Sequence, residues 1–226
     1  MPRTRVLQPG LLLTRPEPAA RRFAARLARP GLGIVISPVL RIEPRPHDRA
    51  AIDAARGLVF TSVHGVRAAG AGRGRPAICV GPATAKAARK AGFAVTVGPG
   101  DAQGMLGLLG DLGPGWLHPH GAHLAQRLPV PGVVVYDQIA QPLTAEAVAL
   151  LAGPAPVVLP LFSPRSAALV ATAVGRPRAA LWVAPISART AAAWQAPQER
   201  MVVAPSPDAA GVAAAVETLL GTEQSP

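Results

Sequence analysis

The sequence predicts an α/β protein built on parallel sheets. Short apolar runs rich in β-branched residues alternate with alanine-rich segments of helical character along most of the 226 residues. A second observation is a repeat. Residues 58–85 and 159–191 each contain an apolar run ending in a hydroxyl, a helical segment, and a second apolar run ending in Gly or Ser. Because the pattern occurs only twice, it predicts two related α/β units rather than a solenoid.

The N-terminal segment is expected to start the first sheet. Residues 10–14 predict a strand, residues 17–29 an amphipathic helix with Phe23 and Leu27 on one face, and residues 33–37 a second strand. The middle region predicts strands at 57–61, 77–80, 93–97 and 115–118 and helices at 48–55, 63–69, 82–91, 102–112 and 121–128. The C-terminal region predicts strands at 156–162, 179–184 and 200–203 and helices at 144–152, 164–174, 188–194 and 207–220. This alternation implies right-handed crossovers between parallel strands.

The junctions between strands and helices carry the chemistry that the pattern predicts. Ser62, Ser163 and Ser187 occupy helix N-cap positions, and Gly81 fills the same place in a fourth junction. In open α/β sheets, ligands bind at the carboxyl ends of the strands, and helix N-termini there attract anions. Four such junctions facing one cleft would suit a ligand with many carboxylates.

The charge of the chain points to an acidic partner. The formal net charge is +11, and 17 of the 23 Lys and Arg residues lie in the first 100 positions. A basic surface attracts nucleic acid, anionic membranes or acidic small molecules. Arginine makes up 21 of the 23 basic residues, which suggests compositional bias, and aromatic residues are only 4% of the chain, too few for a base-stacking platform. A polyanionic small ligand is therefore favoured over nucleic acid.

Several classes of protein are disfavoured by missing patterns. A single cysteine, Cys79, excludes an intrachain disulfide, and no apolar stretch is long enough for a signal peptide or a membrane span. No glycine-rich nucleotide fingerprint is present. His118, His120 and His123 are close enough to suggest a metal site, but they lie at a strand end and turn with no Cys or acidic residue close in sequence. We therefore expect a cytoplasmic protein without metal or cofactor. We also expect a monomer, although no pattern in the sequence indicates the oligomeric state.

The ordered set of motifs resembles the uroporphyrinogen-III synthase family over nearly the whole chain. The matching segments, in chain order, are Thr14-Arg15-Pro16, Phe60-Thr61-Ser62, Val80-Gly81, Val135-Tyr136 and Ala204-Pro205-Ser206-Pro207. The chain departs from the family pattern at three places. His64 replaces an Asn or Arg-like residue, His120-Gly121 replaces an Arg-Gly pair, and Ser187 replaces a more usual Gly.

The resemblance implies two parallel-sheet α/β domains of flavodoxin-like, internally repeated architecture, joined by a two-stranded linker with a cleft between them. The implied divisions are an outer domain of residues 1–37 plus 141–226, an inner domain of residues 45–131, and paired linker strands at 38–44 and 132–140. Without the resemblance, the residues alone would favour a simple division near residues 140–153.

The resemblance also implies a reaction, the cofactor-free cyclisation of hydroxymethylbilane, a linear tetrapyrrole polycarboxylate, to uroporphyrinogen III. Loss of the hydroxyl from ring A gives an azafulvene, and the substituted carbon of ring D attacks it. The resulting spiro intermediate opens and recloses with ring D inverted. Tyr136 would donate a hydrogen bond or proton to the leaving hydroxyl, although the residues alone equally favour a strand aromatic in a packing role. The implied substrate-binding residues are Thr14, Arg15, Ser62, His64, Gly81, Thr84, His120, Ser163, Ser166, Ser187 and Thr190.

Two other functions stay open at this level. A two-lobed binding module could capture an anionic metabolite without chemistry, and it would share the cleft and the basic charge. A nucleic-acid binder is the weaker alternative. Turnover of hydroxymethylbilane separates the first from an enzyme, and salt-dependent duplex binding tests the second.

Overall fold

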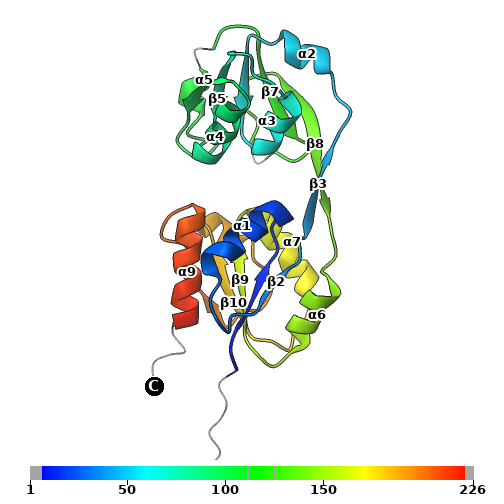
Figure 1. Ribbon diagram of the computed structural model, residues 1–226, viewed down its shortest axis with the longest axis vertical. Helices are drawn as coiled ribbons and strands as arrows, with labels where there is room; N and C mark the ends of the chain where they lie inside the picture. Colours follow the sequence, from blue (N-terminus) through cyan, green and yellow to red (C-terminus); the bar gives the residue numbers. More distant parts are fainter. Residues whose placement is uncertain (1–6, 111, 125, 222–226) are drawn as a thin grey trace, which may run out of the picture. The chain divides into compact units, whose positions relative to one another are not determined.

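The chain folds into two compact units (Figure 1). The computed structural model describes residues 7–110, 112–124 and 126–221. Unit 1 comprises residues 1–41 and 140–226, and unit 2 comprises residues 42–139. Each unit contains one sheet whose strands are largely parallel, so the predicted α/β class is confirmed. Within the described residues, no helix is both long and apolar enough to cross a membrane.

Unit 1 is a five-stranded sheet with helices on both faces. Its strands are β1 (Gly10–Leu13), β2 (Ile34–Ile36), β9 (Val157–Leu161), β10 (Leu181–Pro185) and β11 (Arg200–Met201), in the order β11-β10-β9-β1-β2. Its helices are α1 (Glu17–Leu27), α6 (Ala145–Ala152), α7 (Pro164–Val174), α8 (Ala188–Ala192) and α9 (Ala209–Gly221). Counted along the chain, the strand order is 2-1-3-4-5, which is the flavodoxin-like order.

Both faces of this sheet are buried, as expected for apolar parallel strands. Leu12 and Leu159 point into one core, which includes residues of α6 and α7. Leu11 and Trp182 point into the other, which includes residues of α1 and α9. Side chains that alternate between two cores fix the register of each strand, because a slip by one residue would exchange the two sets.

Unit 2 is a six-stranded sheet. Its strands are β3 (Leu40–Pro44), β4 (Gly57–Phe60), β5 (Pro76–Cys79), β6 (Ala94–Val97), β7 (Trp116–Gly121) and β8 (Gly132–Ala140), in the order β3-β8-β7-β4-β5-β6. Its helices are α2 (Arg49–Ala54), α3 (Val63–Ala69), α4 (Pro82–Lys90) and the short α5 (Leu106–Leu109). Apart from β3, the strands have the chain order 3-2-1-4-5, which differs from that of unit 1. The amide of Arg45 donates a hydrogen bond to the carbonyl of Val135, and the amide of Gln141 donates one to the carbonyl of Val39. This spacing is that of an antiparallel ladder between β3 and β8.

Two predicted helices of unit 2 need correction. The helix expected at 121–128 is wrong, because its described residues form a strand end and irregular turns. The backbone at the start of this segment forms sheet hydrogen bonds instead. Strand β7 continues to Gly121, and the amide of Ala122 donates to the carbonyl of Tyr136. The helix expected at 102–112 shrinks to α5, since three glycines weaken that segment and Asp101 caps a turn at Gly104 instead.

The predicted helix N-caps are confirmed at the repeated junctions. Each serine hydroxyl accepts a hydrogen bond from a backbone amide of the helix that follows it. The donors are the amide of His64 to Ser62 at 3.2 Å, the amide of Ser166 to Ser163 at 3.1 Å, and the amide of Thr190 to Ser187 at 3.3 Å. Gly81 is the N-cap of α4 without a side-chain bond. Each hydroxyl cap is worth about 1 kcal/mol, so these serines stabilise the fold in addition to any contact with a ligand.

Arg75 closes the C-terminal end of α2, and its loss is expected to destabilise unit 2. Its guanidinium donates to the carbonyl of Ile52 at 2.7 Å and to those of Asp53 and Ala55 at 3.3 Å. We predict that Arg75→Ala lowers the free energy of unfolding by about 1.5–3 kcal/mol, the usual worth of a charged hydrogen bond. Urea unfolding followed by circular dichroism measures it, with exposed Arg73→Ala as the matched control. Equal stability of the two variants would contradict the capping role.

Candidate functional site

The strand orders place one topological switch point in each unit. In open α/β sheets, ligands bind outside the carboxyl ends of the two strands where the order reverses. In unit 1 these strands are β1 and β9, followed by Thr14-Arg15 and Phe162-Ser163. In unit 2 they are β4 and β7, and β7 ends at Gly121. Several of the residues predicted from sequence lie at these two edges.

Tyr136 lies beside the switch point of unit 2. It belongs to β8, is 7% exposed, and packs on Gly121 across a β-bulge between His120 and Gly121. Its phenol oxygen faces the hydroxyl of Ser62 and the backbone of Gly121. Burial raises the pKa of Tyr136, while the polar groups of Ser62 and Gly121 act in the opposite direction. A phenol whose pKa is raised stays protonated at neutral pH and can act as a donor.

His64 packs against the same tyrosine. The two ring centroids are 5.4 Å apart with the planes tilted by 51°. Burial, and then the positive charge of Arg67, lowers the pKa of His64. A half-buried imidazole of lowered pKa is mainly neutral at neutral pH, so it contributes a polar but uncharged wall beside Tyr136.

His118 is a buried histidine of the same region. It is 2% exposed, its Nε2 lies 3.0 Å from the hydroxyl oxygen of Thr61, and its ring centroid lies 4.9 Å from that of His120. Burial, and then the neighbouring His120, lowers the pKa of His118 to about 4. It is therefore neutral at working pH. Its neighbour His120 is partly exposed, and the Nδ1 of His120 is within hydrogen-bonding distance, 2.7 Å, of the carbonyl oxygen of Gly121.

The lowered pKa of His118 predicts acid lability. Between about pH 6.5 and pH 4 the unfolded chain binds a proton that the folded chain excludes, so stability falls as the pH falls. We expect about 2 kcal/mol of this loss between pH 7 and pH 5. Comparing urea unfolding of the wild type and His118→Gln at both pH values measures it. An equal loss in both proteins would assign the acid lability to other groups.

Arg15 lies at the switch point of unit 1. Its guanidinium carbon is 3.9 Å from the centroid of the Phe162 ring, and burial followed by the charge of Arg22 lowers the pKa of Arg15 to about 10. At neutral pH it is still a cation. Ser163 lies next to Phe162, and its hydroxyl is 2.8 Å from that of Ser166.

The remaining predicted site residues differ in accessibility. The side chains of Thr14, Thr84, Ser166 and Thr190 are buried, with exposed fractions of 2%, 6%, 8% and 0%. The hydroxyl of Thr190 lies 3.1 Å from that of Ser187. These four side chains are therefore shielded from solvent, whereas Arg15, Ser62, His64, His120, Ser163 and Ser187 keep partly exposed side chains.

No metal centre is evident in the part of the chain that the structure describes. There, no group of three His, Cys, Asp or Glu side chains is placed to hold an ion. His123 instead lies 3.5 Å from Asp137, which also pairs with Arg45 at 3.2 Å. Cys79 is buried, and burial raises the pKa of its thiol to about 11, so the thiol is unreactive at neutral pH.

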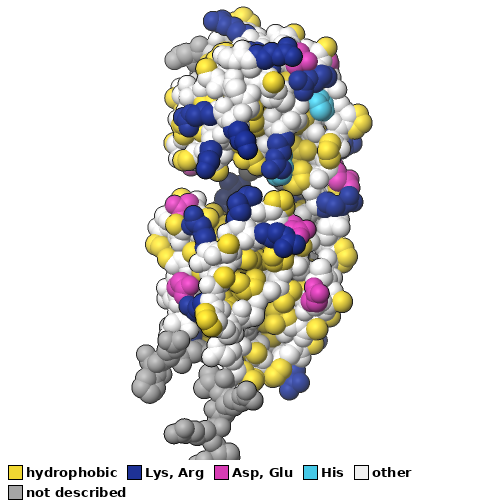
Figure 2. Space-filling view, viewed as in Figure 1, with side chains coloured by type: hydrophobic (Ala, Val, Ile, Leu, Met, Phe, Trp, Pro, Cys, Tyr) yellow, Lys and Arg dark blue, Asp and Glu magenta, His cyan; other side chains and the backbone are white. Residues whose placement is uncertain are grey.

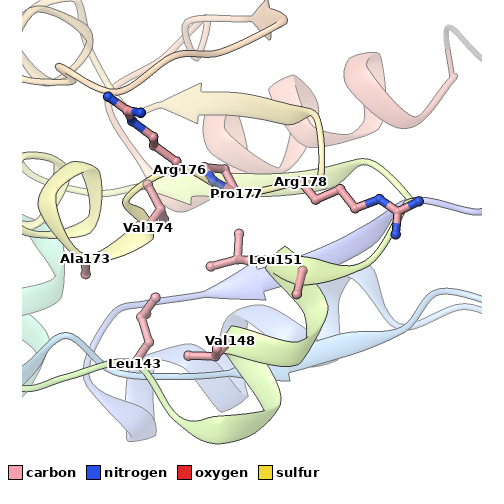
Figure 3. A pocket seen from close by; sticks show the side chains of 9 residues that line it. Leu143, Val148, Leu151, Ala173, Val174, Arg176, Pro177 and Arg178 are labelled. Atoms are coloured by element: carbon pink, nitrogen blue, oxygen red, sulfur yellow. The ribbon is translucent and has the colours of Figure 1, made fainter.

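One pocket lies away from these residues, at the C-terminal ends of α6 and α7 in unit 1 (Figure 3). Its apolar lining includes Leu143, Leu151 and Val174. Arg176 and Arg178 flank it, but Figure 3 shows their side chains extending in different directions. It contains none of the residues predicted from sequence, and it lies at the opposite ends of these helices from the Ser163 junction.

Both units are basic. Unit 1 carries 13 Lys and Arg against 6 Asp and Glu, and unit 2 carries 10 against 6. Figure 2 shows Lys and Arg side chains distributed over the visible face of each unit, with fewer acidic ones. This charge favours an anionic ligand at either edge.

Two residues of these edges were missed by the sequence analysis as parts of the site. Gly121 was noted only for its place in a motif, yet its lack of a side chain makes room for the Tyr136 ring. Phe162 was assigned to a strand, yet it holds the guanidinium of Arg15. Each role depends on a neighbour distant in sequence, so no local pattern could have indicated it.

Comparisons with known proteins agree with this geometry. A uroporphyrinogen-III synthetase from Helicobacter pylori 26695 matches with a TM-score of 0.64 and 14% identity, covering 94% of this chain and 100% of that one. A mutant uroporphyrinogen III synthase from the extremely thermophilic bacterium Thermus thermophilus matches with a TM-score of 0.54 and 16% identity, covering 95% and 99%. At these identities, the two structures establish the fold.

The sequence comparisons identify the family. A search of curated protein sequences found no significant match. The family model described as uroporphyrinogen-III synthase HemD matches residues 21–214, which is most of the chain. The chain therefore belongs to the uroporphyrinogen-III synthase family.

Proposed function

We propose that Tyr136 and the strand-end residues of both units carry out the reaction of this family. As a uroporphyrinogen-III synthase, the protein cyclises hydroxymethylbilane to uroporphyrinogen III in tetrapyrrole biosynthesis. The reaction removes one molecule of water and inverts ring D. The observation that carries the residue assignment is the buried Tyr136 phenol packed on Gly121, at the carboxyl end of β7.

Tyr136 is assigned as the donor to the leaving hydroxyl of ring A. The hydroxyl of Ser62 and the backbone of Gly121 lie beside its oxygen and favour the phenolate. The phenol can donate its proton to an acceptor outside this set. The same two groups would stabilise the charge that develops as the proton moves to the departing hydroxyl, which leaves as water. The proton is recovered when ring closure releases one from the pyrrole carbon.

The strand-end residues are assigned to the carboxylate arms of the substrate. In unit 2 these are Ser62, His64, Gly81, Thr84 and His120, and in unit 1 they are Thr14, Arg15, Ser163, Ser166, Ser187 and Thr190. The partly exposed members would contact the arms directly, and the buried threonines and Ser166 would hold the junction backbone in place. Such contacts restrict the flexible tetrapyrrole so that ring D presents its substituted carbon to ring A.

An isomer assay tests this function. Hydroxymethylbilane cyclises spontaneously to the type I isomer, so the protein is incubated with freshly prepared substrate and the two isomers are separated. We expect the type III isomer to dominate at catalytic protein concentrations. Exclusive type I product, with saturable substrate binding, would identify a non-catalytic binding module instead.

A further inference from the structure

The guanidinium of Arg15 is a largely desolvated cation without an anionic partner among the described residues. Neighbouring arginines of unit 1 pair with carboxylates: Arg21 with Glu17 and Arg29 with Glu217, both at 2.5 Å. No carboxylate of the described chain pairs with Arg15, which stacks on the ring of Phe162 instead. A desolvated cation of this kind carries an energetic cost that an incoming anion would offset.

Phe162 fixes the orientation of this cation. Its ring lies under the guanidinium at 3.9 Å, and Phe23 supports the ring edge-on with centroids 5.0 Å apart and an interplanar angle of 84°. The Nε atom of Arg15 is buried and has no hydrogen-bond partner in the described chain. The hydrogen bonds that Arg15 can still offer to an incoming ligand therefore come from its two terminal nitrogens.

That arrangement suits a carboxylate, the anionic group of the proposed substrate. Two parallel N–H groups at the end of a planar guanidinium bind a carboxylate through both oxygens. The apolar ring of the partly buried Phe162 strengthens such a pair by excluding water from one side of it. Arg15 remains protonated at neutral pH, since its pKa is about 10.

We propose that Phe162 is a positioning residue that holds Arg15 as an end-on receptor for one carboxylate arm of the substrate. The proposal rests on the proposed function, because it assumes the tetrapyrrole polycarboxylate as ligand. It adds Phe162 to the residues that determine substrate binding, and it assigns to Arg15 one planar carboxylate rather than a diffuse attraction.

Steady-state kinetics with hydroxymethylbilane test the receptor. Arg15→Met is expected to raise KM at least 10-fold while kcat changes less than about threefold, because a carboxylate arm keeps the same contact in the bound substrate and in the transition state. Arg15→Lys should recover only part of the affinity, since an ammonium cannot form the two parallel bonds. The matched control is Arg176→Met, which removes the same charge beside the pocket of Figure 3 and should leave KM unchanged.

Stability separates a binding role from a structural one. If Arg15 serves binding, Arg15→Met relieves an uncompensated desolvated cation and leaves the unfolding temperature equal or higher. Phe162→Leu should raise KM about threefold to tenfold, and Phe162→Trp should restore it, since indole also stacks on guanidinium. In the Arg15→Met background, Phe162→Leu should raise KM no further.

The outcomes that overturn the receptor differ from those that overturn the function. A wild-type KM for Arg15→Met, or a lower unfolding temperature with KM unchanged, would make Arg15 a structural residue while type III synthesis continued. An additive effect of Phe162→Leu in the Arg15→Met background would remove the positioning role of Phe162. Failure of the wild type to make the type III isomer would instead remove the proposed function itself.

Discussion

Replacing Tyr136 by phenylalanine is expected to lower kcat about 100-fold, the lower range of general acid catalysis, with little change in KM. Phenylalanine keeps the packing of the 7% exposed ring but removes the oxygen that meets Ser62 and Gly121. Because spontaneous closure continues while the enzymatic route slows, the fraction of type I product should rise. Timed separation of the two isomers measures both effects.

The stability of this variant must be measured alongside its activity. Losing the phenol oxygen leaves the neighbouring polar groups of Ser62 and Gly121 without this partner, and an unpaired buried group costs about 1–3 kcal/mol. A folded variant with wild-type kcat and isomer ratio would remove Tyr136 from the mechanism and leave it a packing residue, the alternative that the sequence left open. Burial raises the pKa of Tyr136, so this proton donor stays protonated at neutral and mildly alkaline pH. We therefore expect no loss of wild-type activity in this pH range from deprotonation of Tyr136.

Gly121→Ala is expected to displace the tyrosine and reduce activity by a second route. A Cβ at this position would lie 2.6 Å from Cε2, 2.7 Å from Cζ and 3.0 Å from the hydroxyl oxygen of Tyr136. The ring would have to move, at an overpacking cost of about 1–3 kcal/mol. Displacements of about 1 Å at a reacting group can cost 100-fold in rate, so we expect kcat to fall at least 10-fold.

Two further variants show whether Gly121 acts through Tyr136. Gly107→Ala is the matched control, because a Cβ there meets no atom within 4 Å and kcat should stay at the wild-type value. In a Tyr136→Phe background, Gly121→Ala should lower kcat little further, since the hydroxyl is already absent. Multiplicative losses in the double variant, or wild-type kcat for Gly121→Ala alone, would contradict this coupling.

The local sequence patterns predicted strands and helices correctly wherever the local preference agreed with the tertiary environment. The helices at Val63–Ala69 and Pro164–Val174 have the predicted bounds, because a serine cap and an alanine-rich segment specify them locally. The helix predicted at 121–128 is wrong because pairing with β8 uses backbone groups that a helix would need. Long-range pairing of that kind is invisible in a window of ten residues, as is the different strand order of unit 2.

The candidate site was predictable only as a set of junctions. Strand-end serines could be found in the sequence because capping is local, but the contacts that give Arg15 and Tyr136 their environments join distant segments. Phe162 lies 147 positions after Arg15, and Gly121 lies 15 before Tyr136. The resemblance supplied the roles, and the structure supplied the partners that make these roles physically specific.

The pairing of β1 with β9 has a consequence for how the chain is made. Gly10 is opposite Val157, and every residue of unit 2 is synthesised in the interval. At about 5–20 residues per second, a nascent β1 waits roughly 7–30 s for this neighbour. During that time unit 2 can fold beside the ribosome, while the apolar segment Leu11–Leu13 lacks one flank of its sheet. This early strand therefore stays unpaired on one side until the second half of unit 1 has been synthesised.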